Sequence, residues 1–319
     1  MPQGMEYPTP LSPLKIGTRG SPLALAQAYE TRDRLRAAFD LPEAAFRVVV
    51  IHTTGDDAAL IAKDKSLKAV GGKGVFTKEI EEALTAGAID IAVHSMKDMP
   101  TAQPEGLVLD CYLPREDTRD AFVSRHGRQL SDLPPGAVVG TSSLRRRAQL
   151  AWRRPDLVVV GFRGNVQTRL RKLDEGVAQA TFLAMAGLKR LGMADVATPI
   201  DPQEMLPAVA QGAIGIERRA GDARIAQMLA AIHDAPTGLR LAAERAFLAT
   251  LDGSCETPIA GLAMIEGDQL HLQGEILRPD GSEAIRGELR GAVGDGVRIG
   301  TELARQLLAQ APDGFFDWR

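Results

Sequence analysis

The segment Val138–Arg147 joins a buried strand to a strongly basic helix, and this junction limits what the chain can fold into. Its sequence, Val-Val-Gly-Thr-Ser-Ser-Leu-Arg-Arg-Arg, begins with β-branched residues typical of a strand and continues as a helix from Leu144. The first backbone N–H groups of a helix have no partner within it, and the helix dipole is positive there. The junction therefore predicts an α/β unit that binds an anion at the end of a strand.

Three arginines, Arg145, Arg146 and Arg147, occupy the first turn of this helix. Cations at a helix N-terminus oppose the dipole, so we expect a negative ligand to compensate them. Nine basic residues but only one acid, Asp156, lie from Arg145 to Lys172, whereas the 319-residue chain has a net charge of −3. The local excess favours a small polyanionic ligand, whereas the net negative charge argues against nucleic acid or an anionic membrane surface. A basic helix face exposed only to solvent is the alternative interpretation.

Strands and helices alternate over most of the chain, which predicts α/β domains. After about residue 235 the pattern changes to a helix, three antiparallel strands within 259–290 and a last helix at 297–309. The predicted organisation is a disordered leader (1–13), a first α/β domain (14–114 and 212–231), a second α/β domain (115–206), and an α+β domain (235–319). A glycine-rich stretch from His52 to Gly74 predicts a long mobile loop, without the spacing of a Walker A phosphate loop.

Polar residues follow several of the expected strands. Arg19 and Ser21 follow the strand at 14–18, and Ser21 before Pro22 predicts a helix start. Ser95, Lys97 and Asp98 follow the strand at 88–93, where ligands bind in open α/β sheets. Arg163 and Arg169 flank the helix start at Asn165 and form a second basic junction. An aspartate among arginines stays ionised and suits the stabilisation of a transient cation, although Lys97 and Asp98 could equally form a plain surface pair.

The two cysteines, Cys111 and Cys255, lie far apart and form neither a disulfide framework nor a zinc-ligand spacing. They indicate a reducing compartment, and without an apolar run of membrane length or a signal peptide we expect a cytoplasmic protein. Cys255 lies in a Gly-Ser-Cys turn between a helix and a strand. It is either an inert buried residue or a covalent attachment point, because no histidine signature supports a hydrolase nucleophile.

Several of these motifs occur together in one known family. They are Val93-His-Ser-Met-Lys-Asp98, Gly140-Thr-Ser-Ser-Leu-Arg-Arg146, Arg163-Gly-Asn165 with Thr168-Arg169, Ala208-Val-Ala-Gln-Gly-Ala213, Ala243-Glu-Arg-Ala246 and the late cysteine. Together they resemble the porphobilinogen deaminases, or hydroxymethylbilane synthases, from about Leu14 to Arg290. The resemblance implies two periplasmic-binding-protein-like α/β domains around a cleft, followed by a small α+β domain with a three-stranded antiparallel sheet.

The resemblance also implies an activity and a cofactor. The family are transferases of porphyrin and haem biosynthesis that polymerise four porphobilinogen molecules onto a covalently bound dipyrromethane and release the linear tetrapyrrole hydroxymethylbilane. A thioether to Cys255 would hold the dipyrromethane, and Asp98 would be the catalytic residue. Substrate and cofactor, with two carboxylates per pyrrole, would be bound by a larger basic and polar set. These residues are Arg19, Ser21, Gln27, Lys73, Ser95, Lys97, Thr141, Ser142, Ser143, Arg145, Arg146, Arg163, Arg169 and Gln211. We expect a monomer with no metal.

The chain departs from the family pattern at four places. Ala69 replaces a lysine before the Gly-Gly-Lys-Gly loop, and Gly161-Phe162 replaces a serine-containing pair. Ala210 and Ser254 each replace a glycine, before Gln211 and Cys255 respectively. A binding protein without catalysis is the main rival interpretation, but such a protein gains nothing from an acid inside a basic cleft.

Overall fold

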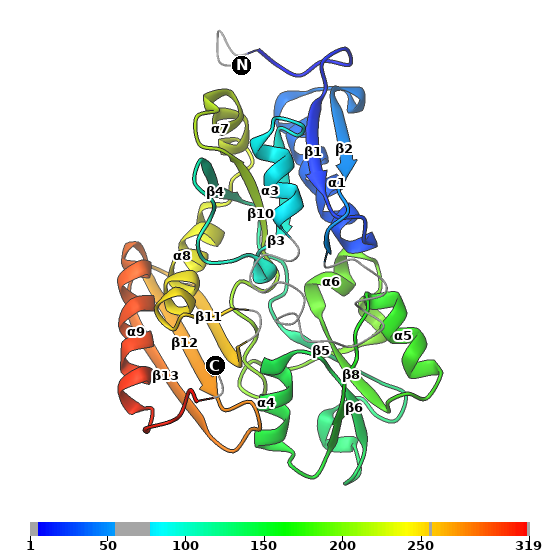
Figure 1. Cartoon of the computed structure of the whole chain (residues 1–319), viewed down its shortest axis with the longest axis vertical. Helices are drawn as coiled ribbons and strands as arrows, with labels where there is room; N and C mark the ends of the chain where they lie inside the picture. Colours follow the sequence, from blue (N-terminus) through cyan, green and yellow to red (C-terminus); the bar gives the residue numbers. More distant parts are fainter. Residues whose placement is uncertain (1–5, 55–76, 255–256, 318–319) are drawn as a thin grey trace. The chain divides into compact units, whose positions relative to one another are not determined.

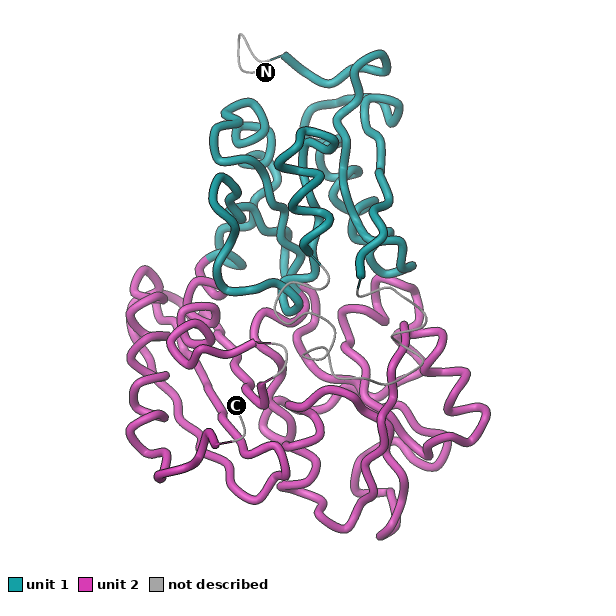
Figure 2. Tube along the Cα trace, in the orientation of Figure 1, with its two compact units in different colours: residues 1–60, 67–115, 213–238 teal, residues 61–66, 116–212, 239–319 magenta. Residues whose placement is uncertain are grey.

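The structure is a computed structural model, and it describes residues 6–54, 77–254 and 257–317 (Figure 1). The chain divides into two compact units (Figure 2). Of the described residues, unit 1 contains 6–54, 77–115 and 213–238, and unit 2 contains 116–212, 239–254 and 257–317. Each unit therefore contains segments that are distant in sequence.

Unit 1 is built on a five-stranded sheet in the order β2-β1-β3-β10-β4. The strands β1 (Leu14–Thr18), β2 (Phe46–Val50) and β3 (Ile91–Ser95) are parallel, and β10 (Ile214–Arg219) runs antiparallel to β3 and to β4 (Leu107–Tyr112). Apolar side chains of α1 (Pro22–Phe39) and α7 (Ala223–Ala230) join one core cluster with the sheet. Apolar side chains of α3 (Lys78–Thr85) belong to a second core cluster.

Unit 2 contains a second five-stranded sheet, in the order β7-β6-β8-β5-β9. The strands β7 (Val158–Val160), β6 (Val138–Gly140) and β8 (Ala180–Ala184) are parallel, and β5 (Asp120–Ser124) runs antiparallel to β8 and to β9 (Thr198–Pro199). Its helices are α4 (Leu144–Arg153), α5 (Val166–Asp174) and α6 (Met185–Arg190). The strand directions therefore follow the same pattern as in unit 1.

The third sheet, also in unit 2, is antiparallel and consists of β11 (Ile259–Glu266), β12 (Gln269–Leu277) and β13 (Ala284–Ala292). The helix α9 (Gly296–Gln310) lies along β12 and β13 (Figure 1). It also packs against α8 (Ala235–Thr250). Gly300 makes this close contact possible, because a Cβ atom there would collide with the carbonyl of Ala243. Short 3-10 helices lie at η1 (Glu43–Ala45), η4 (Met96–Asp98), η5 (Leu130–Asp132), η6 (Ala194–Val196) and η7 (Val293–Asp295).

The predicted fold class is confirmed: two α/β sheets precede a three-stranded antiparallel sheet with helices. The expected disorder of the leader is wrong for the part that the structure describes. Tyr7 packs against Phe39 with ring centroids 5.5 Å apart, and Thr9 and Ser12 form a backbone bridge. Apolar burial at Tyr7 outweighs the prolines that suggested disorder. The loop predicted at 52–74 falls largely outside the described residues. Within the described parts of the chain, no helix is long and apolar enough to cross a membrane.

Candidate functional site

A small cavity in unit 1 brings together five of the predicted site residues. The strands β1 and β3 are parallel neighbours, so the residues that follow them meet at one edge of the sheet. A cavity of about 80 Å³ lies there, and its wall contains Asp98. The other residues that line it are Arg19, Ser21, Leu23, Ala24, Gln27, Thr77, Val93, His94, Ser95 and Met99. The structure thus places a half-buried carboxylate beside a guanidinium and several hydrogen-bonding groups.

Local bonds define the shape of this cavity. The Ser21 side chain caps α1 by accepting from the Ala24 N–H at 3.3 Å, as predicted. The Gln27 amide, which is buried in α1, donates to Ser95 Oγ of β3 at 2.8 Å. This bond holds the helix to the end of the strand that leads into η4. Lys97 lies in η4 beside Asp98 and is half-buried, but it does not line the cavity.

A buried ionisable pair next to the cavity was missed by the sequence analysis. His94 Nε2 lies 3.1 Å from Glu217 Oε2 of β10, and both side chains are almost fully buried. Burial also raises the pKa of the nearby Glu81 carboxyl, which interacts with both residues. The only sequence signal was a glutamate directly after the apolar start, Ile214-Gly-Ile216, of this strand. The pair cross-links β3 to β10 and so fixes the strand that leads to Asp98.

In unit 2, the predicted anion seat at Thr141–Ser143 forms the start of α4. Ser143 caps the helix by accepting from the Arg146 N–H at 3.4 Å, and its own N–H donates to Thr141 Oγ1 at 3.2 Å. Ser142 Oγ accepts from the Phe162 N–H at 2.8 Å. The three hydroxyl groups therefore hold the backbone of the junction in a defined conformation.

Asp120 of β5 supplies one negative charge to the two arginines Arg145 and Arg146, so part of the compensation expected from a ligand comes from the protein itself. Arg145 Nη1 lies 2.6 Å from Asp120 Oδ2, and Arg146 Nη2 lies 2.7 Å from Asp120 Oδ1. All three side chains are buried. Burial by itself would raise the pKa of Asp120, but the charges and hydrogen bonds of the two arginines lower it well below its usual range. We call these three residues the inner arginine cluster.

The second basic junction, at the start of α5, is more accessible than this cluster. Asn165 caps α5 by accepting from the Thr168 N–H at 2.9 Å, as predicted. Arg169 Nε donates to the Gly164 carbonyl at 2.9 Å, and Lys172 Nζ donates to the Arg163 carbonyl at 3.0 Å. Arg163 and Arg169 are both half-buried. Because β6 and β7 are parallel neighbours, α4 and α5 start at the same edge of the sheet.

Gln211 joins the inner arginine cluster through a strained turn. Its Nε2 donates to the Thr118 carbonyl at 2.8 Å and to Asp120 Oδ1 at 3.1 Å. The preceding residue, Ala210, has a φ of 62°, a conformation that glycine adopts more readily. The buried Glu244 of α8 holds this turn, because its carboxylate accepts from the Ala210 N–H at 2.6 Å and from the Ala263 N–H at 2.8 Å.

Cys255 and Lys73, two of the predicted site residues, lie outside the described residues. Two described residues near Cys255 in the sequence, Ser254 and Thr257, are joined by hydrogen bonds. The Ser254 N–H donates to Thr257 Oγ1 at 2.9 Å, and Thr257 Oγ1 donates to the Ser254 carbonyl at 2.7 Å. These bonds use the backbone groups of Ser254 and not its side chain. The other cysteine, Cys111, is buried, and burial raises the pKa of its thiol to about 12, which makes it unreactive.

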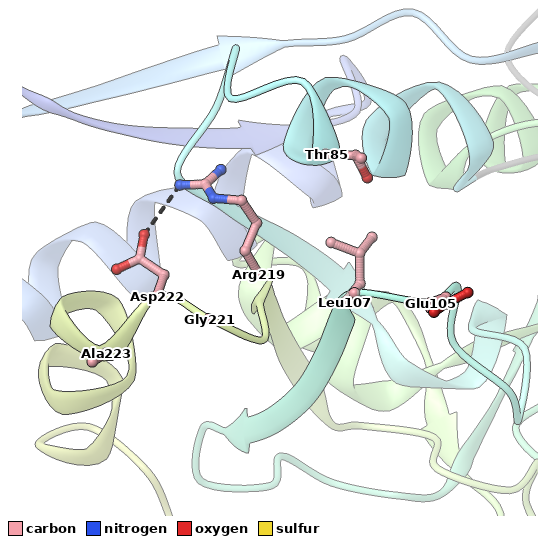
Figure 3. A pocket seen from close by; sticks show the side chains of 8 residues that line it. Thr85, Glu105, Leu107, Arg219, Gly221, Asp222 and Ala223 are labelled. Carbon is pink, nitrogen blue, oxygen red and sulfur yellow. Dashed lines mark hydrogen bonds and ion pairs between the residues drawn. The ribbon is translucent and has the colours of Figure 1, made fainter.

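A larger hollow of about 530 Å³ in unit 1 contains none of the predicted site residues (Figure 3). Arg219 in its wall pairs with Asp222 at 3.1 Å. The same guanidinium donates to the Leu84 and Ile89 carbonyls at 2.9 and 2.8 Å, beside the end of α3. These contacts give Arg219 a structural role, so the size of this hollow does not make it the functional site.

Comparison with known proteins identifies the relatives of the chain. Residues 14–227 match the family model described as porphobilinogen deaminase, dipyromethane cofactor binding domain, and residues 239–309 match the porphobilinogen deaminase C-terminal domain. The porphobilinogen deaminase of Paracoccus denitrificans (strain Pd 1222) is 67% identical over 314 residues, which cover 98% of this chain and 99% of that protein.

Solved structures similar to the chain include periplasmic proteins. One is the periplasmic VFT2 domain of Bordetella pertussis BvgS, with 15% identity, a TM-score of 0.41, and coverage of 69% of this chain and 86% of that one. Another is the lipoprotein Tp32 of Treponema pallidum, with 16% identity, a TM-score of 0.41, and coverage of 69% and 90%.

Proposed function

The chain belongs to the porphobilinogen deaminase family, and from this premise we propose how its residues carry out the reaction. The reaction is the transfer and polymerisation of four porphobilinogen molecules, by deamination and condensation onto bound dipyrromethane, with release of hydroxymethylbilane. The observation that carries our assignment of residues is the position of Asp98 in one cavity with Arg19, Ser21, Gln27 and Ser95.

The residues of unit 2 fit a dipyrromethane group. Each pyrrole of that group has two carboxylates, which need cations or backbone N–H donors. The starts of α4 and α5 lie at one edge of the sheet and have the half-buried Arg163 and Arg169 beside them. We propose that Cys255 holds the group by a thioether, and that Arg163, Arg169 and the Thr141–Ser143 junction hold its carboxylates. When bound, the group supplies the pyrrole carbon to which substrate units are added.

The inner arginine cluster lies at the first turn of α4, directly after the Thr141–Ser143 junction. Arg145 and Arg146 are enclosed and paired with Asp120, so their charges reach a ligand only through the start of α4. Asp120 also holds Gln211. We propose that the three side chains, Arg145, Arg146 and Gln211, act in binding by fixing the geometry of this junction.

Asp98 has the properties required of the catalytic residue. Its carboxylate would accept the pyrrole N–H of porphobilinogen and stabilise the positive charge that develops as ammonia leaves. Arg19 and Lys97 would hold the carboxylates of the substrate, and the bond between Gln27 and Ser95 would keep the cavity in shape. We assign Lys73 to substrate binding on the family resemblance alone.

We also propose a monomeric cytoplasmic enzyme that binds neither nucleic acid nor membranes. The net charge of −3 and the two distant cysteines support this assignment. The division into domains at 14–114 with 212–231, 115–206 and 235–319 likewise stays our proposal. Each of the three sheets lies within one of these proposed domains, and residues 212–231 contribute β10 to the first sheet.

An intact-mass measurement of the purified chain, followed by mapping of the peptide that contains Cys255, tests the attachment. We expect an excess equal to two linked pyrrole units on Cys255. If the chain is unmodified, incubation with porphobilinogen should add this mass. A chain that gains no mass after incubation, or gains it at another residue, would contradict the proposal.

A further inference from the structure

One buried amide connects the third sheet to the inner arginine cluster. Gln149 of α4 is fully buried, and its Oε1 accepts from Arg145 Nη1 at 2.9 Å. Its Nε2 donates to the Leu206 carbonyl at 3.0 Å and to Glu275 Oε2 of β12 at 2.6 Å. Because one end of the amide must accept and the other must donate, these neighbours allow a single orientation of the Gln149 side chain.

Glu275 is an unusual residue for its position. Its side chain is fully buried in the third sheet, where an apolar residue of similar size would avoid the cost of burying a charge. It accepts a hydrogen bond from Arg286 Nε of β13, and Arg153 Nη2 of α4 lies 3.7 Å away. Burial raises the pKa of the carboxyl, while the bond from Gln149 and the charges of Arg153 and Arg145 oppose that rise. Sheet stability alone therefore does not explain this glutamate.

The contacts form a continuous path within unit 2. From Arg286 the path runs through Glu275, Gln149 and Arg145 to Asp120, and from there to Arg146 and Gln211. Glu275 also lies directly opposite Ala260 in the pairing of β12 with β11. Ala260 is five residues after Cys255 in the sequence. Glu275 thus belongs to a strand that pairs with β11, and its side chain contacts the helix that starts at the anion seat.

We propose that Glu275 is a positioning residue, which acts through Gln149 to hold Arg145 on Asp120 and thereby fixes the start of α4 for its anionic ligand. This inference rests on the proposed function of that junction. It differs from a stabilising role, because the consequence of losing Glu275 is a displaced binding group rather than only a weaker sheet.

The test compares two variants with a matched control. Glu275→Gln keeps the shape of the side chain but cannot accept from both Gln149 and Arg286. Gln149→Leu removes the amide that hydrogen-bonds to both Arg145 and Glu275, and it leaves the ion pair between Glu275 and Arg286 intact. The control, Glu266→Gln, removes an exposed pair with Arg290 (2.8 Å) in the same sheet.

For each holoenzyme we would measure cofactor mass, KM and kcat with porphobilinogen, and hydrogen exchange over α4. We expect each of the two variants to raise KM about tenfold, the loss typical of one hydrogen bond to a charged group, with a smaller change in kcat. Exchange at α4 should become faster, whereas the control should behave as the wild type. The double variant should show about the same KM as the more affected single variant, because both substitutions interrupt one path.

The proposal would be overturned if both variants had the wild-type KM and the wild-type rate of hydrogen exchange over α4. This holds whether or not their melting temperatures are lower. Multiplied KM effects in the double variant would also overturn it, because the two residues would then act independently. If Glu275→Gln does not fold, Gln149→Leu decides by itself. A wild-type chain with neither cofactor mass nor turnover would instead overturn the proposed function, and the role of Glu275 with it.

Discussion

Replacing Asp120 by asparagine should destabilise unit 2 strongly, because this one buried carboxylate is paired with two buried arginines. Asp120 is fully buried, and its oxygens accept from Arg145, Arg146 and Gln211 at distances of 2.6 to 3.2 Å. An asparagine removes the carboxylate with which both guanidinium groups are paired in the protein interior. Removing one member of a buried ion pair costs about 3–5 kcal/mol, and we expect a loss of that size for Asp120→Asn.

The loss can be measured as a change in the free energy of unfolding by urea titration, followed by tryptophan fluorescence and circular dichroism. A matched control is Asp174→Asn, which removes a pair with Arg125 at 2.7 Å in which both side chains are more than half exposed. An exposed pair of this kind contributes at most about 1 kcal/mol. Equal effects of the two substitutions would refute the burial and pairing of the inner arginine cluster.

The same variant should change the response to acid. The pKa of Asp120 is lowered in the folded chain, so its contribution to stability is fully present above the ordinary aspartate pKa of about 3.9. That contribution decreases as the pH falls from about 4 towards the lowered folded value. Asp120→Asn should therefore flatten the dependence of stability on pH in this range. A variant that keeps the acid sensitivity of the wild type would contradict the assigned pKa direction.

Three further predictions concern catalysis, strain and binding. Asp98→Asn should retain the cofactor mass and the melting temperature but lower kcat by about 10²–10³, as expected for the loss of electrostatic stabilisation; near-normal turnover would remove Asp98 from its role. Ala210→Gly should raise the free energy of unfolding by about 0.5–1 kcal/mol, because it relieves a φ of 62° at some cost in chain entropy. A destabilised glycine variant would contradict the strain at this turn. Arg163→Leu should raise KM or impair cofactor assembly, and wild-type kinetics at low substrate would count against a binding role.

Local signals in the sequence were sufficient for several of the elements, although β4 (Leu107–Tyr112) was not predicted. Ser21 before Pro22 and Asn165 before Val166 both start helices in the structure, since a cap depends only on the next few residues. Alternating hydrophobicity predicted the three antiparallel strands after residue 259, because successive side chains of a strand point to opposite faces of its sheet. The position of Asp98 after β3 was predictable as well, because the end of a parallel strand is where a ligand site forms.

Only the tertiary structure decided which charges are available to a ligand. In the sequence, Arg145 and Arg146 resemble Arg163 and Arg169, because each pair lies near the start of a helix. In the structure, the first two are buried and paired with Asp120, whereas the other two are half-buried. Pairs such as His94 with Glu217 and Gln149 with Glu275 join residues more than a hundred positions apart. Whether a charged side chain is exposed or neutralised depends on the elements that pack against it, and sequence spacing does not specify that packing. The sequence by itself thus determined many of the elements and the family, whereas the fold determined which charged side chains are buried and paired.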